Sequence, residues 1–507
     1  MKNFIRSNIF FFFILFVICF AVYGKTMNFG ITRLDDDKLT VNNINYISDY
    51  KNIPKFFKTD CYHASGHLYY RPILSLSFSL ESMFFGYNTK VYHTTNILLF
   101  ILSLFLIFVF LSKFNFNKNI LKFLIVLCAV HPILASVPAW LPARNDSLFT
   151  IFLISSFIFF IKYLSSKKYS HLFLYLFFYA LSVFTKETAL IMIIIFPFLT
   201  ILPFTNSPFR LKQKLCNSLC LAAIILFYFF MRYNSSVYKL DISFYFTNFG
   251  TFIKNIIFGT MAYIRYILFP NYMPILIHNF RPDAITIILS LSFFAALIFI
   301  YYKKIFSQKI ILFSAVFFFI SILPTFLEQE YIILFHRLVI VVPAILIILS
   351  LIIENFLSHY PTTKKYLILI FILLFTIYTY ASFNQTDKYK NGLFFWTEAA
   401  KINPTYHVVY QGLGNEYMFL KEYHIAEILF RYAIKEKNSY DYNLNLATAL
   451  IVQNKIDDAI EILLKLDKRK ENTTTLRYLS QLYNVKGEKE KAEKYKARLT
   501  KFLKGKD

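Results

Sequence analysis

The chain has 507 residues, of which 57% are hydrophobic and only 16% are charged. A soluble protein of this length would be about one quarter charged, so this composition excludes an ordinary water-soluble enzyme. The formal net charge of +25 would suit a nucleic-acid partner, but no basic and aromatic pattern of a nucleic-acid module occurs, and loop lysines of a membrane protein explain much of the excess.

The apolar residues come in blocks of about 18 to 20, long enough to cross a bilayer as helices. The first block, 9–23, follows Lys2 and Arg6. A signal peptide has this pattern too, but the poor cleavage site favours an uncleaved first span. A long loop, 25–91, comes next. Within it Pro72–Phe85 is apolar but too short to span, and is expected to lie in the membrane interface.

Basic loops order the remaining spans, because short cytoplasmic loops carry an excess of Lys and Arg. The second span is predicted at 93–111, the third ends at His131 and the fourth starts at Asp146. The fifth and sixth form a hairpin that turns outside at Lys186 and Glu187, and the seventh ends at Arg232. The last four are predicted at 284–302, 310–326, 338–357 and 366–383. The segment 251–268 is predicted to be an outer interfacial helix, since a span there would place the lysines at 303–309 outside. The prediction is eleven spans, with the N-terminus inside.

The last part of the chain is charged and repeats with a period of 33 residues. Small and large apolar residues recur at matching positions: Leu413, Gly414, Ala426 and Phe430, then Leu446, Ala447, Ala459 and Leu463, then Leu479, Ser480 and Ala492. This pattern resembles the tetratricopeptide repeat. Lys496 stands where an apolar residue belongs, as in a solvated last repeat. Such a stack usually binds peptide; a rigid spacer or a dimerisation arm is the alternative.

The sequence thus predicts an all-α protein of two domains, a multi-spanning bundle over 1–385 and an outward-facing α-solenoid over 386–507. Under this topology, charged groups collect at the outer face of the bundle, where ionisable residues at membrane depth are functional candidates. Each also has an ordinary explanation. Three consecutive aspartates are most often a solvated loop, and Lys186 with Glu187 could be a simple interfacial pair.

An ordered series of short motifs links these groups: Asp35-Asp36-Asp37, Tyr70-Arg71-Pro72, Phe85-Gly86-Tyr87-Asn88, Tyr92-His93-Thr94-Thr95-Asn96, His131-Pro132, Ala143-Arg144-Asn145-Asp146, Lys186-Glu187 and His336-Arg337. The series resembles the GT-C class of multi-spanning glycosyltransferases that carry tetratricopeptide repeats and are related to protein O-mannosyltransferases. The resemblance covers essentially the whole chain. Departures are Leu34, Ser136 and Val339, where such proteins often have an aromatic residue, Glu and Tyr.

The resemblance implies transfer of a sugar, such as mannose, from a polyprenyl-phosphate carrier to a hydroxyl acceptor at the outer membrane face. Asp36 or Asp35 is the expected general base, with Asp36 slightly favoured and Asp37 as local support. The implied phosphate ligands are Arg71, Arg144, Lys186 and Arg337, with His93, Glu187 and His336 in supporting positions.

The resemblance leaves the sugar and the acceptor open. A protein acceptor is favoured by the repeats, and a lipid or surface polysaccharide is the alternative. A non-catalytic membrane scaffold that presents the repeats is the rival from another class. No cofactor is required, although three aspartates could attract a divalent cation. The expected partners are the lipid-linked sugar, membrane lipids and a protein or peptide, without nucleic acid, and the expected location is a bacterial inner membrane.

Overall fold

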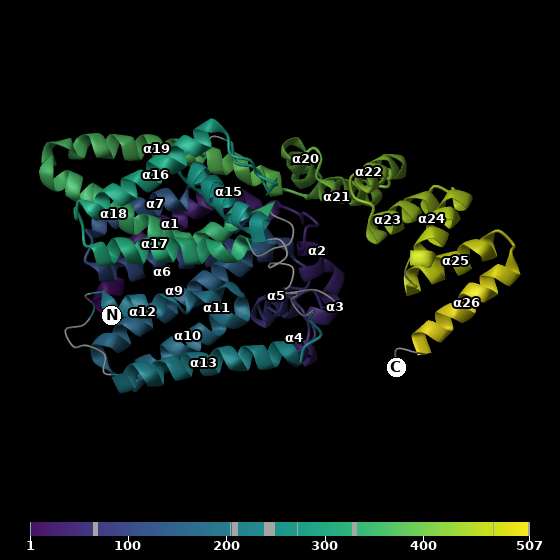
Figure 1. Cartoon of the computed structure of the whole chain (residues 1–507), viewed down its shortest axis with the longest axis horizontal. Coiled ribbons are helices and arrows are strands. Elements are labelled where there is room, and N and C mark those ends of the chain that lie inside the picture. Colours follow the sequence, from purple (N-terminus) through teal and green to yellow (C-terminus); the bar gives the residue numbers. More distant parts are fainter. Residues whose placement is uncertain are drawn as a thin grey trace. The chain divides into compact units, whose positions relative to one another are not determined.

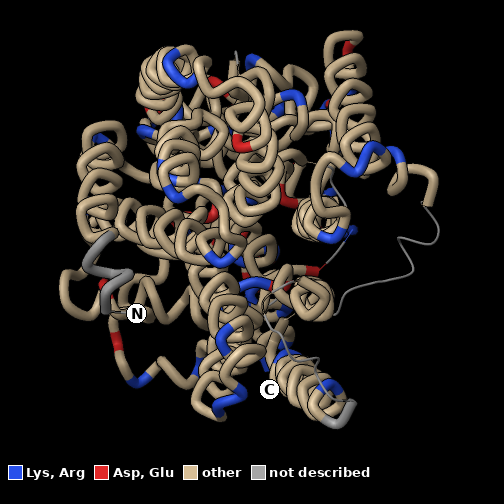
Figure 2. Tube along the Cα trace, turned by 90° about the vertical axis from the view of Figure 1, so that its left-hand side faces the viewer, with Lys and Arg blue, Asp and Glu red and all other residues tan. Residues whose placement is uncertain are grey.

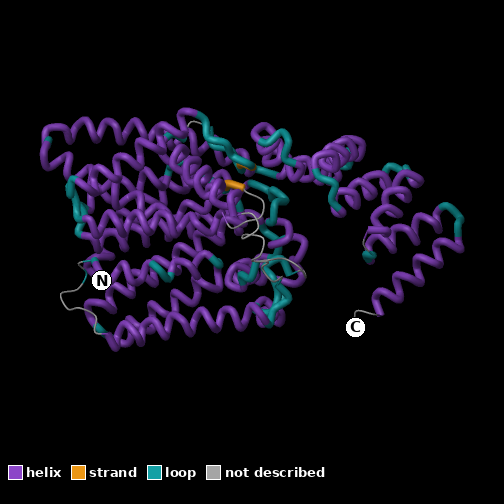
Figure 3. Tube along the Cα trace, viewed as in Figure 1, coloured by secondary structure: helices purple, strands orange, loops and turns teal. Residues whose placement is uncertain are grey.

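The computed structural model describes residues 2–63, 69–202, 204, 211–237, 249–270, 272–326, 332–469 and 471–504. This part of the chain is almost entirely helical; its two short strands, β1 (Ile277–His278) and β2 (Ile332–Ile333), pair antiparallel (Figure 3). The predicted all-α class is confirmed. The chain divides into two compact units, Met1–Asn391 and Gly392–Asp507, so the boundary falls a few residues after the predicted one.

The chain is a multi-pass membrane protein. Within the described ranges, eight segments are long and apolar enough to cross a membrane: Asn8–Asn28, Thr89–Phe114, Leu141–Ser166, Gln213–Tyr233, Ala284–Tyr302, Gln308–Phe326, Phe335–His359 and Pro361–Tyr389. Their main helices lie side by side in Figure 1: α1 (Lys2–Tyr23), α6 (Thr89–Leu111), α9 (Arg144–Ser166), α13 (Leu211–Tyr233), α16 (Ala284–Tyr302), α17 (Gln308–Ile322), α18 (Val342–His359) and α19 (Lys364–Thr386). Each overlaps a span expected from hydropathy.

The predicted count of eleven is not reached in the described chain. The third expected span is α7 (Lys118–Ala129) followed by a 57° bend into the short helices of 132–139. Pro132 lies at this bend, and its missing N–H and fixed φ stop α7 from continuing. The fifth and sixth expected spans are α10 (Tyr169–Thr185) and the interrupted pair α11 (Thr188–Met192) and α12 (Ile195–Ile201), which are shorter than the about 20 residues typical of a spanning helix.

Two segments predicted to lie outside the spans are helical but do not qualify as spans. One is α5 (Pro72–Phe85), whose serine face (Ser75, Ser79 and Ser82) is buried while Phe84 and Phe85 are exposed. The other is α15 (Phe249–Leu268), which is not among the eight candidates. The Arg265 guanidinium near its end pairs with Asp283 at 2.6 Å, just before α16 begins.

The loop between α1 and α6 is a folded subdomain, which hydropathy did not predict. It forms the short helices α2 (Asp36–Leu39), α3 (Ile44–Ile47) and α4 (Ile53–Phe56) before α5. A separate apolar core joins these elements to α5 and α6 through Ile31, Leu39, Ile47, Cys61, Tyr62, Leu74, Phe78, Tyr92 and Leu141. This core fixes the aspartates of the loop relative to the bundle.

The two ends of the bundle differ in character. The helices α18 and α19 connect at the left in Figure 1, and Lys364 and Lys365 are exposed beside this turn. Figure 2 faces this side of the molecule, where lysine and arginine recur near helix ends. The short helices α2 to α5 lie at the opposite end of the bundle, at the right in Figure 1. The candidate site residues belong to that second end.

The C-terminal unit is a series of helices that starts with α20 (Gly392–Ile402). Two sets then alternate, and within each set the helices begin 33 residues apart: α21 (His407–Phe419), α23 (Tyr440–Val452) and α25 (Thr473–Val485), and α22 (Tyr423–Glu436), α24 (Ile456–Arg469) and α26 (Lys489–Lys504). A Cβ atom on Gly414 of α21 would overlap the Phe430 ring of α22. Small residues therefore lie where helices cross closely, as the pattern predicts.

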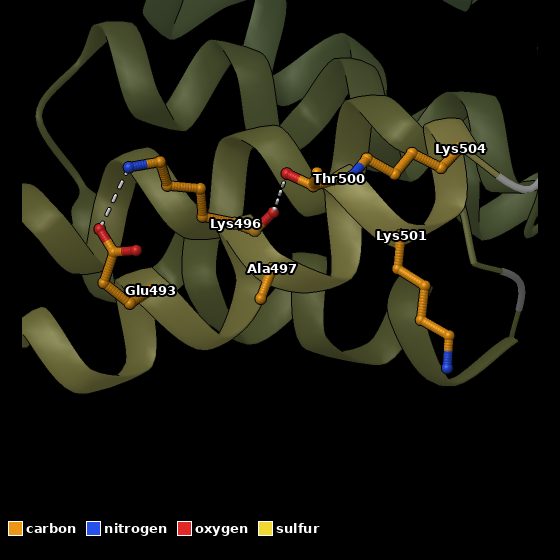
Figure 4. Close-up of a pocket in the computed structure, with 6 residues that line it drawn as sticks. All are labelled: Glu493, Lys496, Ala497, Thr500, Lys501 and Lys504. Carbon is orange, nitrogen blue, oxygen red and sulfur yellow. Dashed lines mark hydrogen bonds and ion pairs between the residues drawn. The ribbon is translucent and has the colours of Figure 1, made fainter.

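The last helix of this unit is solvated. A shallow hollow on α26 is lined by Glu493, Lys496, Ala497, Thr500, Lys501 and Lys504 (Figure 4). The Lys496 ammonium reaches Glu493 at 3.2 Å, and the Thr500 hydroxyl donates to the Lys496 carbonyl at 3.0 Å. Lys496 replaces an apolar residue without burying a charge, because no further repeat covers it in the described chain.

Candidate functional site

The three aspartates after the first span point to different partners. Asp35 precedes α2 with φ of 75°, a left-handed conformation that costs a non-glycine residue about 1–3 kcal/mol. Asp36 is 1% exposed and accepts from the Thr32 backbone N–H at 2.6 Å, the Thr32 hydroxyl at 3.0 Å and the Asp37 N–H. The Asp37 carboxylate accepts from Asn42 at 3.1 Å. Asp36 is therefore saturated by local donors, whereas Asp35 is not.

Burial makes both leading aspartates stronger bases than usual. It raises the pKa of Asp36 to about 7, although the hydrogen bonds from Thr32 act in the opposite direction. Burial also raises the pKa of Asp35, against the lowering effects of Lys38, a Tyr62 hydrogen bond and Arg71. A carboxylate whose pKa lies nearer neutrality is better suited to remove a proton from a hydroxyl. The interaction with Arg71 also places Asp35 within electrostatic range of the cationic cluster.

Arg71 and Glu187 form the first ion pair of the site. The Arg71 Nε donates to Glu187 Oε2 at 3.0 Å, and the Tyr70 backbone N–H donates to Glu187 Oε1 at 3.1 Å. Arg71 directly precedes Pro72, the first residue of α5, so the helix start fixes its backbone. The Arg71 and Glu187 side chains are 16% and 29% exposed, and the pair remains open to solvent.

Asp146, Lys186 and His336 form a second, deeper group. The Lys186 ammonium lies 2.6 Å from Asp146 Oδ1, and His336 Nε2 lies 3.7 Å from Asp146 Oδ2. Lys186 has an extended backbone at the turn between α10 and α11, which directs it toward the start of α9. Arg337, half-buried beside His336, interacts electrostatically with Asp146 and Lys186.

Asn145 connects the two groups. In the amide orientation that satisfies its neighbours, it accepts from Arg71 Nη1 at 3.2 Å and donates to the Thr185 carbonyl at 2.7 Å. Arg71 also interacts electrostatically with Lys186 and His336. Five segments distant in sequence therefore meet at one end of the bundle: the aspartate turn, the start of α5, the start of α9, the α10–α11 turn and the His336-Arg337 pair.

No protein-family model, curated protein or solved structure matches this chain. The chemical interpretation of the site therefore depends on its own geometry.

Arg144 lies in a separate, closed cluster. Its side chain is fully buried, and its nitrogens donate to Asn96 Oδ1 at 2.8 Å, Glu81 Oε2 at 2.8 Å and the Tyr92 carbonyl at 2.9 Å. Its guanidinium also covers the Phe78 ring at 4.0 Å. In this conformation Arg144 has no free face for a phosphate. It joins α5, α6 and α9 instead of lining the site.

His93 contacts the segment that precedes the three aspartates. It is 1% exposed, and its Nε2 lies 3.4 Å from the Gly30 carbonyl, with the ring edge-on to Phe29. These contacts connect α6 to the strand-like segment that leads into the aspartate turn. His93 therefore holds the segment that leads to Asp35.

Three further residues complete the site. The sequence placed Asp146 in a motif without giving it a role, and it did not single out Thr32 or Trp140. Asp146 is the common partner of Lys186 and His336; its position in an apolar block was a usable signal, since carboxylates are rare there. Thr32 and Trp140 carried no such signal. The Trp140 indole N–H donates to the Thr32 hydroxyl at 3.0 Å, and this contact spans 108 residues of sequence.

The site combines two carboxylates whose pKa is raised by burial, Asp35 and Asp36, with several cationic side chains. Within the described ranges, no group of three or more His, Cys, Asp or Glu side chains is arranged to hold a metal ion, and the divergent directions of Asp35, Asp36 and Asp37 explain this locally. The arrangement is suited to removing a proton at one point and stabilising an anion nearby.

Proposed function

We propose that this protein is a membrane glycosyltransferase of the GT-C type, which transfers a sugar from a polyprenyl-phosphate carrier to a hydroxyl acceptor. The observation that supports the proposal is the convergence of Asp35, Arg71, Lys186, Glu187, His336 and Arg337, which come from four separate motifs. Charges buried at the membrane edge are costly, and a scaffold without activity has no need for them.

Asp35 is the better general base of the two leading aspartates. Asp36 is saturated by Thr32 and Asp37, whereas Asp35 is half-buried, interacts electrostatically with Arg71 and is held in a strained turn. Strained backbone is retained where the surroundings enforce it, often at functional sites. Asp36 then supports Asp35, which reverses the slight preference from sequence.

The reaction needs one base and one anion site. The acceptor hydroxyl oxygen bonds to the anomeric carbon while Asp35 takes its proton, and the bond from that carbon to the phosphate oxygen breaks with its electron pair. The phosphate leaves as an anion, so no acid has to protonate it. Arg71 and Arg337 are the proposed ligands of this anion. Glu187, the partner of Arg71, is partly exposed, whereas Asp146, the partner of Lys186, is buried.

On binding, the phosphate of the donor would replace the Glu187 carboxylate as the partner of Arg71. In the present structure Glu187 Oε2 lies 3.0 Å from Arg71 Nε, and both side chains are partly exposed. A carrier phosphate can replace this carboxylate as the partner of Arg71 without burying an unpaired charge. The same logic does not apply to Arg144, whose partners are enclosed.

The repeats and the membrane orientation belong to the same proposal. The helix pairs of 33 residues support a tetratricopeptide-like stack that recognises a protein acceptor or partner. The basic helix ends at the far side of the bundle support a cytoplasmic location for that side, with the site and the repeats outside the cytoplasm, as in a bacterial inner membrane.

Sugar transfer from labelled polyprenyl-phosphate donors into membrane acceptors tests the proposal. Asp35→Asn should abolish transfer at normal membrane abundance, while Asp36→Asn should retain part of it. Asp49→Asn is the matched control, because Asp49 is an exposed aspartate of the same loop.

Two results would contradict the proposal. Equal transfer by wild type and Asp35→Asn would show that Asp35 is not the base. Absence of transfer by the wild type across several sugar donors and acceptors would favour the scaffold instead.

A further inference from the structure

Trp140 contacts both halves of the candidate site. It lies between α8 (Ser136–Ala139) and α9, in the stretch that returns from the bend at Pro132. Its indole N–H donates to the Thr32 hydroxyl at 3.0 Å. Its ring packs on His336 with centroids 5.0 Å apart and planes at 60°. One side chain therefore touches the loop that carries the aspartates and the group that surrounds Asp146.

The Thr32 hydroxyl links Trp140 to the aspartates through hydrogen bonds. Its hydroxyl accepts from Trp140 and from the Leu34 N–H at 3.3 Å, and donates to Asp36 Oδ2 at 3.0 Å. A hydroxyl has one proton, so the hydrogen bond from Trp140 directs that proton toward Asp36. Asp36 in turn accepts the Asp37 N–H and so holds the first turn of α2.

The position of Trp140 is itself fixed by the bundle. The Asn96 side chain donates to the Trp140 carbonyl at 3.0 Å, and Asn96 also accepts from Arg144. Both Asn96 and Arg144 are fully buried. The indole is therefore attached to the rigid part of the molecule, and the loop is attached to the indole.

We propose that the hydrogen bond from Trp140 to Thr32 anchors the Asp35–Asp36 turn to the bundle and makes Trp140 a positioning residue for the base. The catalytic part of this inference rests on the proposed glycosyltransferase function; the anchoring part does not. Trp140 does not react itself. It sets the distance between the carboxylate that removes the proton and the cations that receive the leaving anion.

Trp140→Phe and Thr32→Val test the anchor in the full-length protein. Phenylalanine keeps the ring against His336 but removes the N–H, and valine keeps the shape of threonine without the hydroxyl. Hydrogen–deuterium exchange of the peptide 30–43 should rise about fivefold to tenfold in each variant, because one hydrogen bond contributes about that factor to local opening. Thr32→Ser should restore wild-type exchange.

The same variants should separate positioning from donor binding. Trp140→Phe should lower kcat about fivefold to tenfold and change the donor KM less than about twofold, since only the base is displaced. The double variant Trp140→Phe/Thr32→Val should lose no more activity than Thr32→Val alone, because Trp140 acts through the Thr32 hydroxyl. Trp396→Phe, at the other tryptophan of the chain, is the control and should leave exchange of 30–43 and kcat unchanged.

The outcomes test the anchor, the positioning role and the proposed function separately. Unchanged exchange in Trp140→Phe and Thr32→Val overturns the anchor. Raised exchange with unchanged kcat overturns the positioning role. If the wild type transfers no sugar from any donor, the proposed function fails, and the exchange experiment alone still supports or overturns the anchor.

Discussion

Arg71 and Arg144 were both expected to bind phosphate, but they have different surroundings in the structure. Arg144 is fully buried and donates to Asn96, Glu81 and a carbonyl, so each of its partners is part of the fold. Arg71 is partly exposed, and its carboxylate partner, Glu187, is more exposed still. The comparison teaches that a cation is available to a ligand only where its partner can be exchanged at little cost.

The largest expected effect lies at the closed cluster. Arg144→Ala leaves Glu81 as an unpaired, largely buried carboxylate and Asn96 without its donor, and removing one member of a buried pair costs about 3–5 kcal/mol. Thermal unfolding in detergent and membrane abundance should both show this loss. Stability equal to wild type would place Arg144 in the same class as Arg71 and break the comparison.

The next effect concerns Asp36, which is buried in the loop. Its folded-state pKa of about 7 lies above the ordinary value near 4, so the protonated form favours the folded state. This stabilisation is fully present below about pH 4 and is lost as the pH rises through 7. Relative to Asp36→Asn, the free energy of unfolding of the wild type should therefore fall by at most about 4 kcal/mol between pH 4 and 8.

Denaturation of both proteins across this pH range measures the difference. Asp49→Asn, at an exposed aspartate, should follow the wild type at every pH. Parallel curves for wild type and Asp36→Asn would mean that Asp36 is not buried in solution.

The smallest of the three effects is expected at the open pair. Arg71→Ala should leave the fold stable, because Glu187 can be hydrated, but transfer should fall about tenfold to a hundredfold, the value of one hydrogen-bonded charge. The loss should be partly restored by Arg71→Lys. Lys55→Ala, at an exposed lysine of the same loop, is the control. Undiminished transfer by Arg71→Ala would exclude Arg71 as a phosphate ligand.

Long-period patterns were the most successful part of the sequence analysis. The predicted 33-residue period agrees with the structure, where helices begin at His407, Tyr440 and Thr473, because small residues must recur wherever two helices cross. The long apolar blocks predicted all eight span candidates of the described chain, because a helix must be apolar over about 20 residues to cross a bilayer. The span count was less successful, because hydropathy does not register a bend such as that at Pro132 or an interrupted helix such as 188–201.

The sequence predicted which charged residues are candidates, but it did not predict their contacts. Asp35, Arg71, Lys186, Glu187, His336 and Arg337 could be selected because ionisable residues at membrane depth are rare. The sequence could not show that Asp36 is held by local hydrogen bonds, since its donors include the Thr32 backbone N–H and the Thr32 hydroxyl. Trp140 could not be selected either, because its contact with Thr32 spans 108 residues.

By itself, the sequence determined that this is an all-α protein with a membrane bundle and a charged helical repeat unit, because composition and periodicity are local properties of the chain. Only the tertiary structure decided which charges are exchangeable. Arg71 and Arg144 have the same guanidinium, but one lies in a partly exposed pair and the other in a closed one. That difference depends on burial and on complete hydrogen bonding, which arise only when distant segments pack together.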